Sequence, residues 1–156
     1  MKVAVVFYST GENCAFVAEE IKKQFNADII RLQTTDEKER KGAASFLWAL
    51  GIMNQKPPLK PYDFDPNAYD LIVIGAPIWA SSPASPVQTF ISSAGITGKK
   101  IALFTCHAGK KETAMEKFKA MLPGNTIVAT KGFRSPLKNS EEAKQHITDW
   151  AKAFAE

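Results

Sequence analysis

The sequence predicts an α/β protein in which a doubly wound parallel sheet is covered by helices on both faces, in three layers. Five β-rich apolar segments alternate with segments whose apolar residues recur at helical spacing, which is the pattern of this class. The strongest apolar runs are nearly continuous, as in strands that are buried on both faces. A chain of 156 residues without a repeat or linker has the usual size of one domain, so we expect a single domain over residues 1–156.

The expected strands are the apolar runs themselves. They cover residues 3–8, 27–32, 71–75, 101–105 and, as the weakest, 126–129. The first run ends at Tyr8-Ser9-Thr10, too soon to be the apolar core of a signal peptide. No run approaches the ~18 apolar residues that a membrane-spanning helix needs. We therefore expect a cytoplasmic protein without a membrane segment.

The expected helices have apolar residues at every third or fourth position. They cover residues 14–25, 46–53, 86–91, 114–122 and 140–154. Pro86 suits a first helical turn, and Ser140 before two glutamates suits the start of the last helix. The helix at 46–53 interrupts the long segment 34–61, where a bare loop would be unusual. Its apolar face could pack on the sheet, cover a ligand or meet a second subunit, and we favour packing on the sheet.

Several kinds of site are excluded by motifs that the sequence lacks. It contains neither the glycine-rich loop of nucleoside-triphosphate-binding proteins nor the G-x-G-x-x-G fingerprint of dinucleotide-binding proteins. No acidic residue ends the first or third strand, where a phospho-accepting receiver domain needs one, and no arginine follows Cys14 or Cys106 at phosphatase spacing. The two cysteines and two histidines lack zinc-ligand spacing and allow one disulfide at most. We expect no metal site and no disulfide scaffold.

Three segments that follow strands carry the candidate binding residues, because ligands of doubly wound sheets bind beyond the carboxyl ends of the strands. Residues 9–14 combine hydroxyls, a glycine and a helix start, which favours phosphate binding. Residues 75–83 present Trp79 for stacking on a flat ring. Residues 105–111 supply small residues and donors that can approach a heterocycle. Together they predict a phosphorylated ligand with a planar ring, held without a metal, and FMN is the foremost candidate.

The same segments resemble those of the flavodoxin-like family, and the resemblance covers nearly the whole chain. The phosphate loop of the family, aromatic-Ser-x-Thr-Gly-Asn-Thr, is similar to Phe7-Tyr8-Ser9-Thr10-Gly11-Glu12-Asn13-Cys14. Its flavin-stacking loop is similar to Ile74-Gly75-Ala76-Pro77-Ile78-Trp79, and its third, glycine-rich loop stands at Thr105-Cys106-His107-Ala108-Gly109. The segment from Phe46 to Pro61 resembles that of single-domain members of the NAD(P)H-linked reductase type.

The resemblance implies the strand order 2-1-3-4-5 and an FMN-binding redox protein, active in electron transfer or in NAD(P)H-linked reduction. No side chain needs to act as a catalytic acid, base or nucleophile, because the flavin carries the electron chemistry. The implied cofactor-binding residues are Ser9, Thr10, Gly11, Glu12, Asn13, Cys14, Pro77, Ile78, Trp79, Ala80, Thr105, Cys106, His107, Ala108 and Gly109.

The phosphate loop departs from the family pattern at two positions. Glu12 stands where the family has glycine, and Cys14 replaces the last threonine. A carboxylate near a phosphate weakens binding unless it turns to solvent. These departures keep an alternative open, in which the chain is a flavin-free module of the same fold that acts in interaction or regulation.

Residues of the first loop also have simpler interpretations. Serine, threonine and asparagine are common in turns and at helix N-caps. The simpler interpretation gives Ser9, Thr10 and Asn13 these structural roles. Cys14 at a helix start could have a lowered pKa, although a small buried side chain is the favoured interpretation. A redox pair of Cys14 with Cys106 is conceivable, since both follow strands that end at the same edge of the sheet.

Two further residues have competing interpretations of the same kind. Trp79 could stack on the flavin or simply plug the end of the sheet. His107 could be a solvated loop residue. Alternatively, with Lys110 and Lys111, it could place positive charge beside the flavin, stabilise anionic reduced flavin and raise the second reduction potential.

The charge of the chain bears on its partners. The formal net charge is +4, and it is unevenly divided, because residues 1–78 hold 9 basic and 10 acidic side chains whereas residues 79–156 hold 11 and 6. The basic half, at +5 against −1, contains the third loop. We therefore expect an acidic or anionic redox partner, protein or small electron acceptor, rather than nucleic acid. The chain is expected to be a monomer or a homodimer.

Overall fold

The long strands of the protein form one parallel sheet. The structure is a computed structural model that describes residues 1–35, 56–107 and 112–155. The strands are β1 (Val3–Phe7), β2 (Asp28–Arg31), β3 (Leu71–Trp79), β5 (Lys100–His107) and β6 (Thr126–Arg134). They pair in parallel in the order β2-β1-β3-β5-β6, and the short strand β4 (Ser82–Pro83) pairs antiparallel with the end of β3. Counted without β4, this is the order 2-1-3-4-5, so the predicted fold class is confirmed.

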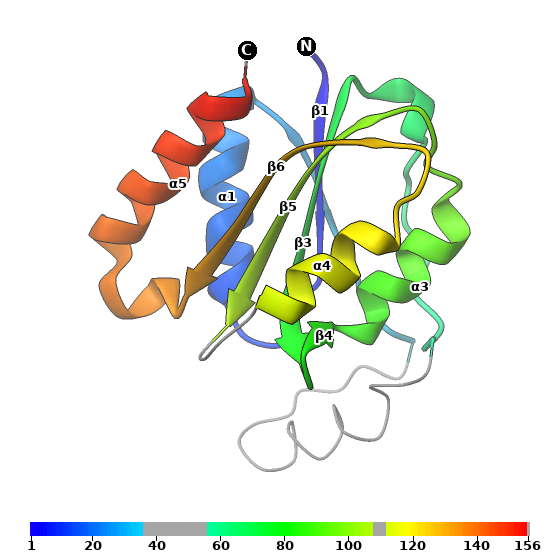
Figure 1. Ribbon diagram of the computed structural model, residues 1–156, viewed down its shortest axis with the longest axis horizontal. Coiled ribbons are helices and arrows are strands. Elements are labelled where there is room, and N and C mark those ends of the chain that lie inside the picture. Colours follow the sequence, from blue (N-terminus) through cyan, green and yellow to red (C-terminus); the bar gives the residue numbers. More distant parts are fainter. Residues whose placement is uncertain (36–55, 108–111, 156) are drawn as a thin grey trace.

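Helices cover both faces of the sheet (Figure 1). One face carries α1 (Asn13–Phe25) and α5 (Ser140–Phe154), and the other carries α3 (Ser85–Ala94) and α4 (Glu112–Ala120). In Figure 1 the arrowheads of β3, β5 and β6 point to the same end of the molecule, and because β1 and β2 are parallel to them, this end gathers the carboxyl ends of the parallel strands.

Each face of the sheet has its own apolar core, and alternate strand residues contribute to each. In β1, Val5 packs in the cluster that contains Ile147 of α5, whereas Val6 packs in the cluster that contains Phe90 of α3. All of β1 is buried. Burial on both faces explains why the strand sequence is a continuous apolar run rather than an alternating one.

Three strands extend further toward the candidate site than predicted. β3 continues past Gly75 to Trp79, β5 continues to His107, and β6 continues to Arg134. The expectation that residues 76–79 form a loop is therefore wrong. The physical reason is that each added residue finds a ladder partner: Pro77 pairs with Cys106, and Cys106 pairs with Phe133.

A two-residue turn joins β3 to β4. Ala80 and Ser81 have φ angles of 48° and 62°, which are left-handed values for both central residues. This is the conformation of a type I′ hairpin turn, which matches the twist of the flanking strands. The backbone N–H of Ala84 donates a hydrogen bond of 2.9 Å to the Pro77 carbonyl oxygen and returns the chain to the sheet before α3 begins.

Two other predicted helices lie where the sequence places them, but their first and last residues differ from the prediction. The expected helix 86–91 is α3, in which Pro86 occupies the second position, and the expected helix 114–122 is α4. Two short 3-10 helices, η1 (Pro66–Ala68) and η2 (Pro136–Asn139), are additional. The helix predicted at residues 46–53 lies outside the described residues.

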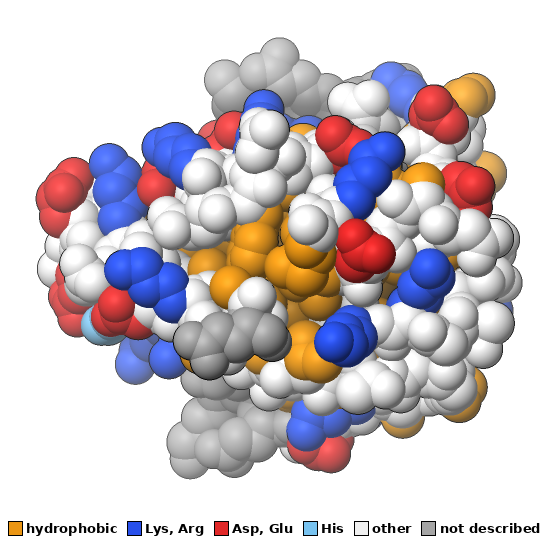
Figure 2. Space-filling model, turned by 90° about the horizontal axis from the view of Figure 1, so that it is seen from above, with side chains coloured by type: hydrophobic (Ala, Val, Ile, Leu, Met, Phe, Trp, Pro, Cys, Tyr) orange, Lys and Arg blue, Asp and Glu red, His pale blue; other side chains and the backbone are white. Residues whose placement is uncertain are grey.

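The end of the molecule that holds both termini lies opposite the carboxyl ends of the strands. Figure 2 shows apolar side chains at the centre of this face, with acidic and basic side chains interspersed around them. This face therefore presents no field of a single sign. Within the described ranges, no helix is both long and apolar enough to cross a lipid bilayer.

Candidate functional site

A cavity of about 250 Å³ opens at the carboxyl ends of β1, β3 and β5. The residues that line it are Ser9, Thr10, Gly11, Asn13, Cys14, Pro77, Ile78, Trp79, Cys106, His107 and Ser135. All except Ser135 belong to the set that the sequence assigns to the site. The sheet order brings them together, because β1, β3 and β5 are neighbours and end at the same edge.

The start of α1 forms the first wall of the cavity. Glu12 occupies the N-cap position, and its side chain makes no capping hydrogen bond. The first N–H groups of a helix have no acceptor inside the helix, so here they are left without a side-chain cap. Together with the positive end of a 13-residue helix, they provide donors for an anion.

The loop before α1 leaves room for such an anion. The Ser9 hydroxyl donates a hydrogen bond to the Gly11 carbonyl oxygen and holds the loop in a tight turn. A Cβ atom at Gly11 would meet no other atom within 4 Å, so space lies open beside this residue. The uncapped helix start and this open space fit the phosphate group of a nucleotide.

Glu12 does not line the cavity. Its side chain is 71% exposed, and its carboxylate lies 3.7 Å from Nη2 of Arg31, the last residue of β2. The same Nη2 lies 3.5 Å from the Ser9 carbonyl oxygen, and the guanidinium sits over the Phe7 ring, 5.7 Å from its centroid. The carboxylate that departs from the family pattern is therefore turned to solvent and paired with a cation.

Trp79 forms the opposite wall. It is half-buried at the end of β3, directly before the left-handed turn, and its ring meets Tyr8 edge-on at 5.7 Å between centroids. The Tyr8 ring is itself buried. This contact restrains the Trp79 ring beside the cavity, which suits a residue that stacks on a flat ligand.

The third wall joins β5 to the segment after β6. The backbone N–H of Ser135 donates to the His107 carbonyl oxygen at 2.9 Å, and His107 is opposite Arg134 in the ladder. The Leu137 N–H donates to Oδ1 of Asn13 at 3.2 Å, which ties η2 to the start of α1. The Asn13 amide therefore has a structural partner at Oδ1, while the residue also lines the cavity.

Ser135 is the lining residue that sequence reasoning missed. Its φ of 41° places it in the left-handed region, and it follows β6 directly. The predicted end of that strand was residue 129, so no loop was assigned to Ser135. A correct end for β6 would have indicated it by the same strand-end rule.

Cys14 and Cys106 meet at the floor of the cavity. Both are buried free thiols, both line the cavity, and both pack in the same core cluster. Burial, followed by the interaction with Cys106, raises the pKa of the Cys14 thiol well above its ordinary value. The direction is opposite to the lowered pKa that a helix start alone would favour.

Two further predicted residues, Ala80 and Thr105, are not among the residues that line the cavity. Ala80 is exposed in the hairpin turn. Thr105 is fully buried, and its neighbours Phe104 and Cys106 belong to the core beneath α1 and α5, so alternation points Thr105 to the other face. Its hydroxyl has no hydrogen-bond partner among the described residues. Ala108 and Gly109 lie outside the described residues, as do Lys110 and Lys111.

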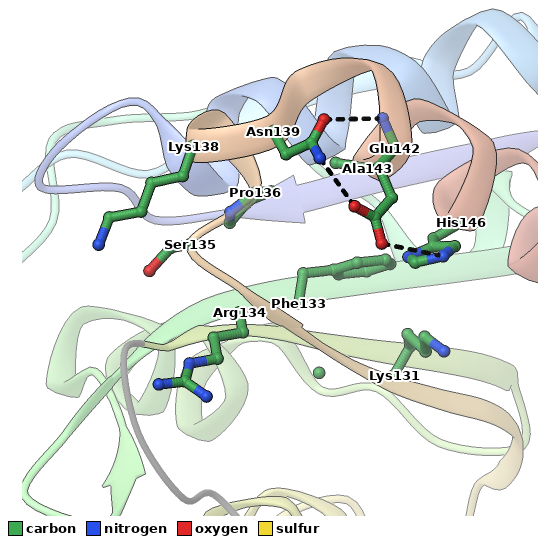
Figure 3. Close-up of a pocket in the computed structure, with 11 residues that line it drawn as sticks. Lys131, Phe133, Arg134, Ser135, Pro136, Lys138, Asn139, Glu142, Ala143 and His146 are labelled. Carbon is green, nitrogen blue, oxygen red and sulfur yellow. Dashed lines mark hydrogen bonds and ion pairs between the residues drawn. The ribbon is translucent and has the colours of Figure 1, made fainter.

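A second cavity, of about 570 Å³, lies beside the first, between β6, η2 and α5 (Figure 3). Its floor includes the buried residues Phe133, Pro136 and Ala143. Ser135 lines both cavities. Glu142 is held at the start of α5 by Asn139, whose Nδ2 donates to the carboxylate at 2.8 Å, and lies 3.9 Å from His146.

Three cations line this second cavity: Lys131, Arg134 and Lys138. None of them forms an ion pair with a carboxylate of the described residues. An apolar floor with unpaired cations around it favours an anionic ligand or partner group. No cluster of three or more histidine, cysteine or acidic side chains able to hold a metal ion occurs in the part of the chain that the structure describes.

Comparison with known proteins agrees with this architecture. The chain resembles a flavoprotein from Lactobacillus acidophilus NCFM, solved in complex with FMN, at 20% identity and a TM-score of 0.73, over 90% of this chain and 97% of that one. It also resembles oxidised Flavodoxin 2 from Bacillus cereus, at 19% identity and a TM-score of 0.65, over 99% and 98% of the two chains. Two-electron reduced Megasphaera elsdenii flavodoxin is similar at 18% identity and a TM-score of 0.62, over 96% and 98%.

At these identities the solved structures show a shared fold. None of the curated proteins compared with this sequence matches it significantly. A family model described as Flavodoxin matches residues 2–154, nearly the whole chain. The sequence motifs, the strand order and this match agree, and the chain belongs to the flavodoxin family.

Proposed function

We propose that this chain binds FMN in the cavity at the ends of β1, β3 and β5 and works as an electron-transfer protein. The observation that carries the proposal is the uncapped start of α1, which faces the same cavity as the half-buried ring of Trp79. One wall suits a phosphate and the other suits a flat ring. Membership of the flavodoxin family and the FMN complex of the Lactobacillus acidophilus relative support this assignment.

Each wall has a separate task in this proposal. The backbone N–H groups at the start of α1, with Thr10 and the Asn13 amide, hold the phosphate. Trp79 stacks on the ring and excludes water from one side of it. When bound, the flavin accepts and donates the electrons, and the protein supplies anchoring and electrostatics.

The charge around the second cavity supports an anionic electron partner. Lys131, Arg134 and Lys138 lie in the basic half of the chain, and Ser135 connects this cavity to the flavin cavity. A cationic surface beside the flavin increases the encounter rate with an anion and lowers it with a cation. We propose that the acidic or anionic partner approaches over this surface.

Cofactor binding is tested first with the purified protein. We expect flavin absorbance, FMN release on heat denaturation, and tight rebinding in a titration followed by flavin fluorescence. Trp79→Leu should weaken FMN binding about tenfold, since loss of an aromatic contact of about 1.4 kcal/mol has this effect. The matched control is Trp150→Phe, on the buried face of α5, which should leave FMN binding intact. A folded wild-type protein that takes up no FMN would instead support the flavin-free module.

The partner proposal is tested with small acceptors of opposite charge. After anaerobic reduction, the FMN-loaded protein should react with ferricyanide faster at low salt than at high salt, and with hexaammineruthenium(III) slower at low salt. Lys131→Glu with Lys138→Glu should reverse both salt effects. Equal salt dependence in variant and wild type would contradict the proposal. Rapid reduction of the bound flavin by NADH or NADPH would identify a reductase instead of a carrier.

A further inference from the structure

The two cysteines lie on α1 and β5, two elements that border the proposed flavin cavity. Cys14 is the second residue of α1, and Cys106 is the last but one residue of β5. They are separated by more than half of the chain, yet both line the cavity and both are free thiols. A pair of thiols brought together in this way can be joined by a disulfide without unfolding the protein, provided that their sulfur atoms can meet.

The two thiols are neighbours in the same part of the core. Cys14 and Cys106 both belong to the apolar core beneath α1 and α5, and Cys106 is among the groups that perturb the Cys14 thiol. Cys14 is 1% exposed and Cys106 is 6% exposed, so Cys106 is the more accessible of the two. A small oxidant that enters the cavity therefore reaches Cys106 first, and Cys14 lies next to it as the resolving thiol.

Bond formation would change the anion site. A disulfide holds two sulfur atoms about 2 Å apart, which is closer than any non-bonded contact. Because Cys14 belongs to the first turn of α1, this shortening would pull the uncapped helix start toward β5. The N–H groups of that turn are the donors assigned to the phosphate, and their strength depends on their position.

We propose that Cys14 and Cys106 form a reversible disulfide that weakens cofactor binding, so that the flavin cavity contains its own oxidation switch. The disulfide is a property of the protein alone, whereas its effect on FMN rests on the proposed function. Hydrogen peroxide is the oxidant that we assign to it, because it is small enough to enter a cavity of about 250 Å³.

The chemistry balances in two steps. The Cys106 thiolate attacks one oxygen of hydrogen peroxide, the O–O bond breaks, and Cys106 becomes a sulfenic acid as hydroxide leaves. Cys14 then loses its proton and attacks the Cys106 sulfur, the S–O bond breaks, and water leaves. Two thiols and one peroxide thus give one disulfide and two waters. The raised pKa of Cys14 slows this second step.

The disulfide is tested on the native protein without added FMN. After peroxide treatment and removal of excess oxidant, intact-mass measurement should show the loss of two hydrogen atoms, and a thiol reagent applied under denaturing conditions should find no free thiol. Dithiothreitol should restore both thiols. Cys14→Ser and Cys106→Ser should each abolish the loss of two hydrogens. Both thiols remaining free, or each being oxidised separately to sulfinic acid, would overturn the proposal.

The switch is tested by comparing FMN affinity before and after oxidation. We expect oxidised protein to bind FMN at least tenfold more weakly than reduced protein, and dithiothreitol to reverse the change. Each serine variant that folds should bind FMN equally well before and after peroxide, which separates the disulfide from methionine oxidation. A disulfide without an effect on affinity would overturn the switch. Reduced protein that binds no FMN would refute the proposed function, while the mass result would still decide whether the disulfide forms.

Discussion

The turn between β3 and β4 places two residues with side chains in the left-handed region. Ala80 and Ser81 have φ angles of 48° and 62°, although glycine and asparagine are the residues that favour this conformation. The turn directly follows Trp79, which lines the candidate site. Strain of this kind is retained where the surrounding structure holds the backbone in place. Replacing Ala80 by asparagine and Ser81 by glycine should therefore stabilise the protein.

The expected gain in stability follows from the energetic cost of placing residues with side chains in the left-handed region. A left-handed residue with a Cβ atom costs about 1–2 kcal/mol. A glycine at this position recovers the cost but loses about 0.5–1 kcal/mol through the greater freedom of the unfolded chain. For Ala80→Asn with Ser81→Gly we expect the free energy of unfolding to rise by about 1–2 kcal/mol. For a chain of this size, that corresponds to an increase in Tm of about 2–8 °C.

Thermal unfolding followed by circular dichroism measures this change. Ser82→Gly is the matched control, because Ser82 lies in β4 and pairs with Trp79. Glycine in a strand is unfavourable, so the control should lower Tm. Tm should thus rise in the doubly substituted turn variant and fall in Ser82→Gly. A lower Tm in the doubly substituted turn, or the same change at both positions, would refute the argument from backbone strain.

Three other predictions test packing, ionisation and electrostatics. A Cβ at Gly75 would lie 2.0 Å from a ring atom of Phe104, so Gly75→Ala should lower the free energy of unfolding in urea by about 1–3 kcal/mol. Phe104→Leu in the same chain should recover part of the loss. Burial and a 2.9 Å hydrogen bond to an aspartate of β2 raise the pKa of Tyr69 from 10.0 to about 12. The neutral phenol therefore stabilises the fold fully below pH 10.0, and this stabilisation is lost as the pH rises to about 12. Urea midpoints should show that Tyr69→Phe removes this component of the decline, and an unchanged pH profile would contradict it. Arg31→Gln should weaken FMN binding by up to about fivefold, the equivalent of a surface ion pair of up to about 1 kcal/mol. Glu12→Gln in the same chain should restore affinity, high salt should reduce the difference, and an Arg31→Gln defect that resists both would assign Arg31 a different role.

The parallel sheet could be predicted from sequence because its strands are buried on both faces. Such strands appear as continuous apolar runs, as residues 3–7 of β1 show. Their order came from the resemblance to a family rather than from the runs themselves. The ends of the strands could not be predicted, because they depend on partners that are distant in sequence. Pro77 lies two residues after Gly75 and favours a loop locally, yet Cys106 provides a ladder partner and extends β3.

Those residues of the candidate site that lie at or just after the ends of predicted strands could be found from the sequence. Ser9, Trp79 and His107 each come after or at the end of a predicted strand, and the sheet brings them to one cavity. Ser135 and Arg31 could not be found in this way. Ser135 depends on the true end of β6, and the position of Arg31 depends on the register that sets it beside Phe7. Register is a tertiary property that short sequence patterns do not specify.

The two departures from the family's phosphate loop have separate structural solutions. Glu12 turns outward to Arg31, and Cys14 turns inward to Cys106, so neither side chain blocks the start of α1. Both substitutions change side chains and leave the backbone N–H groups in place. Because an uncapped helix start binds anions through those groups, the phosphate site depends mainly on the backbone of the first turn. Glu12 then adds a screened repulsion that Arg31 offsets, and the irregular sequence of the loop is compatible with a working flavin site.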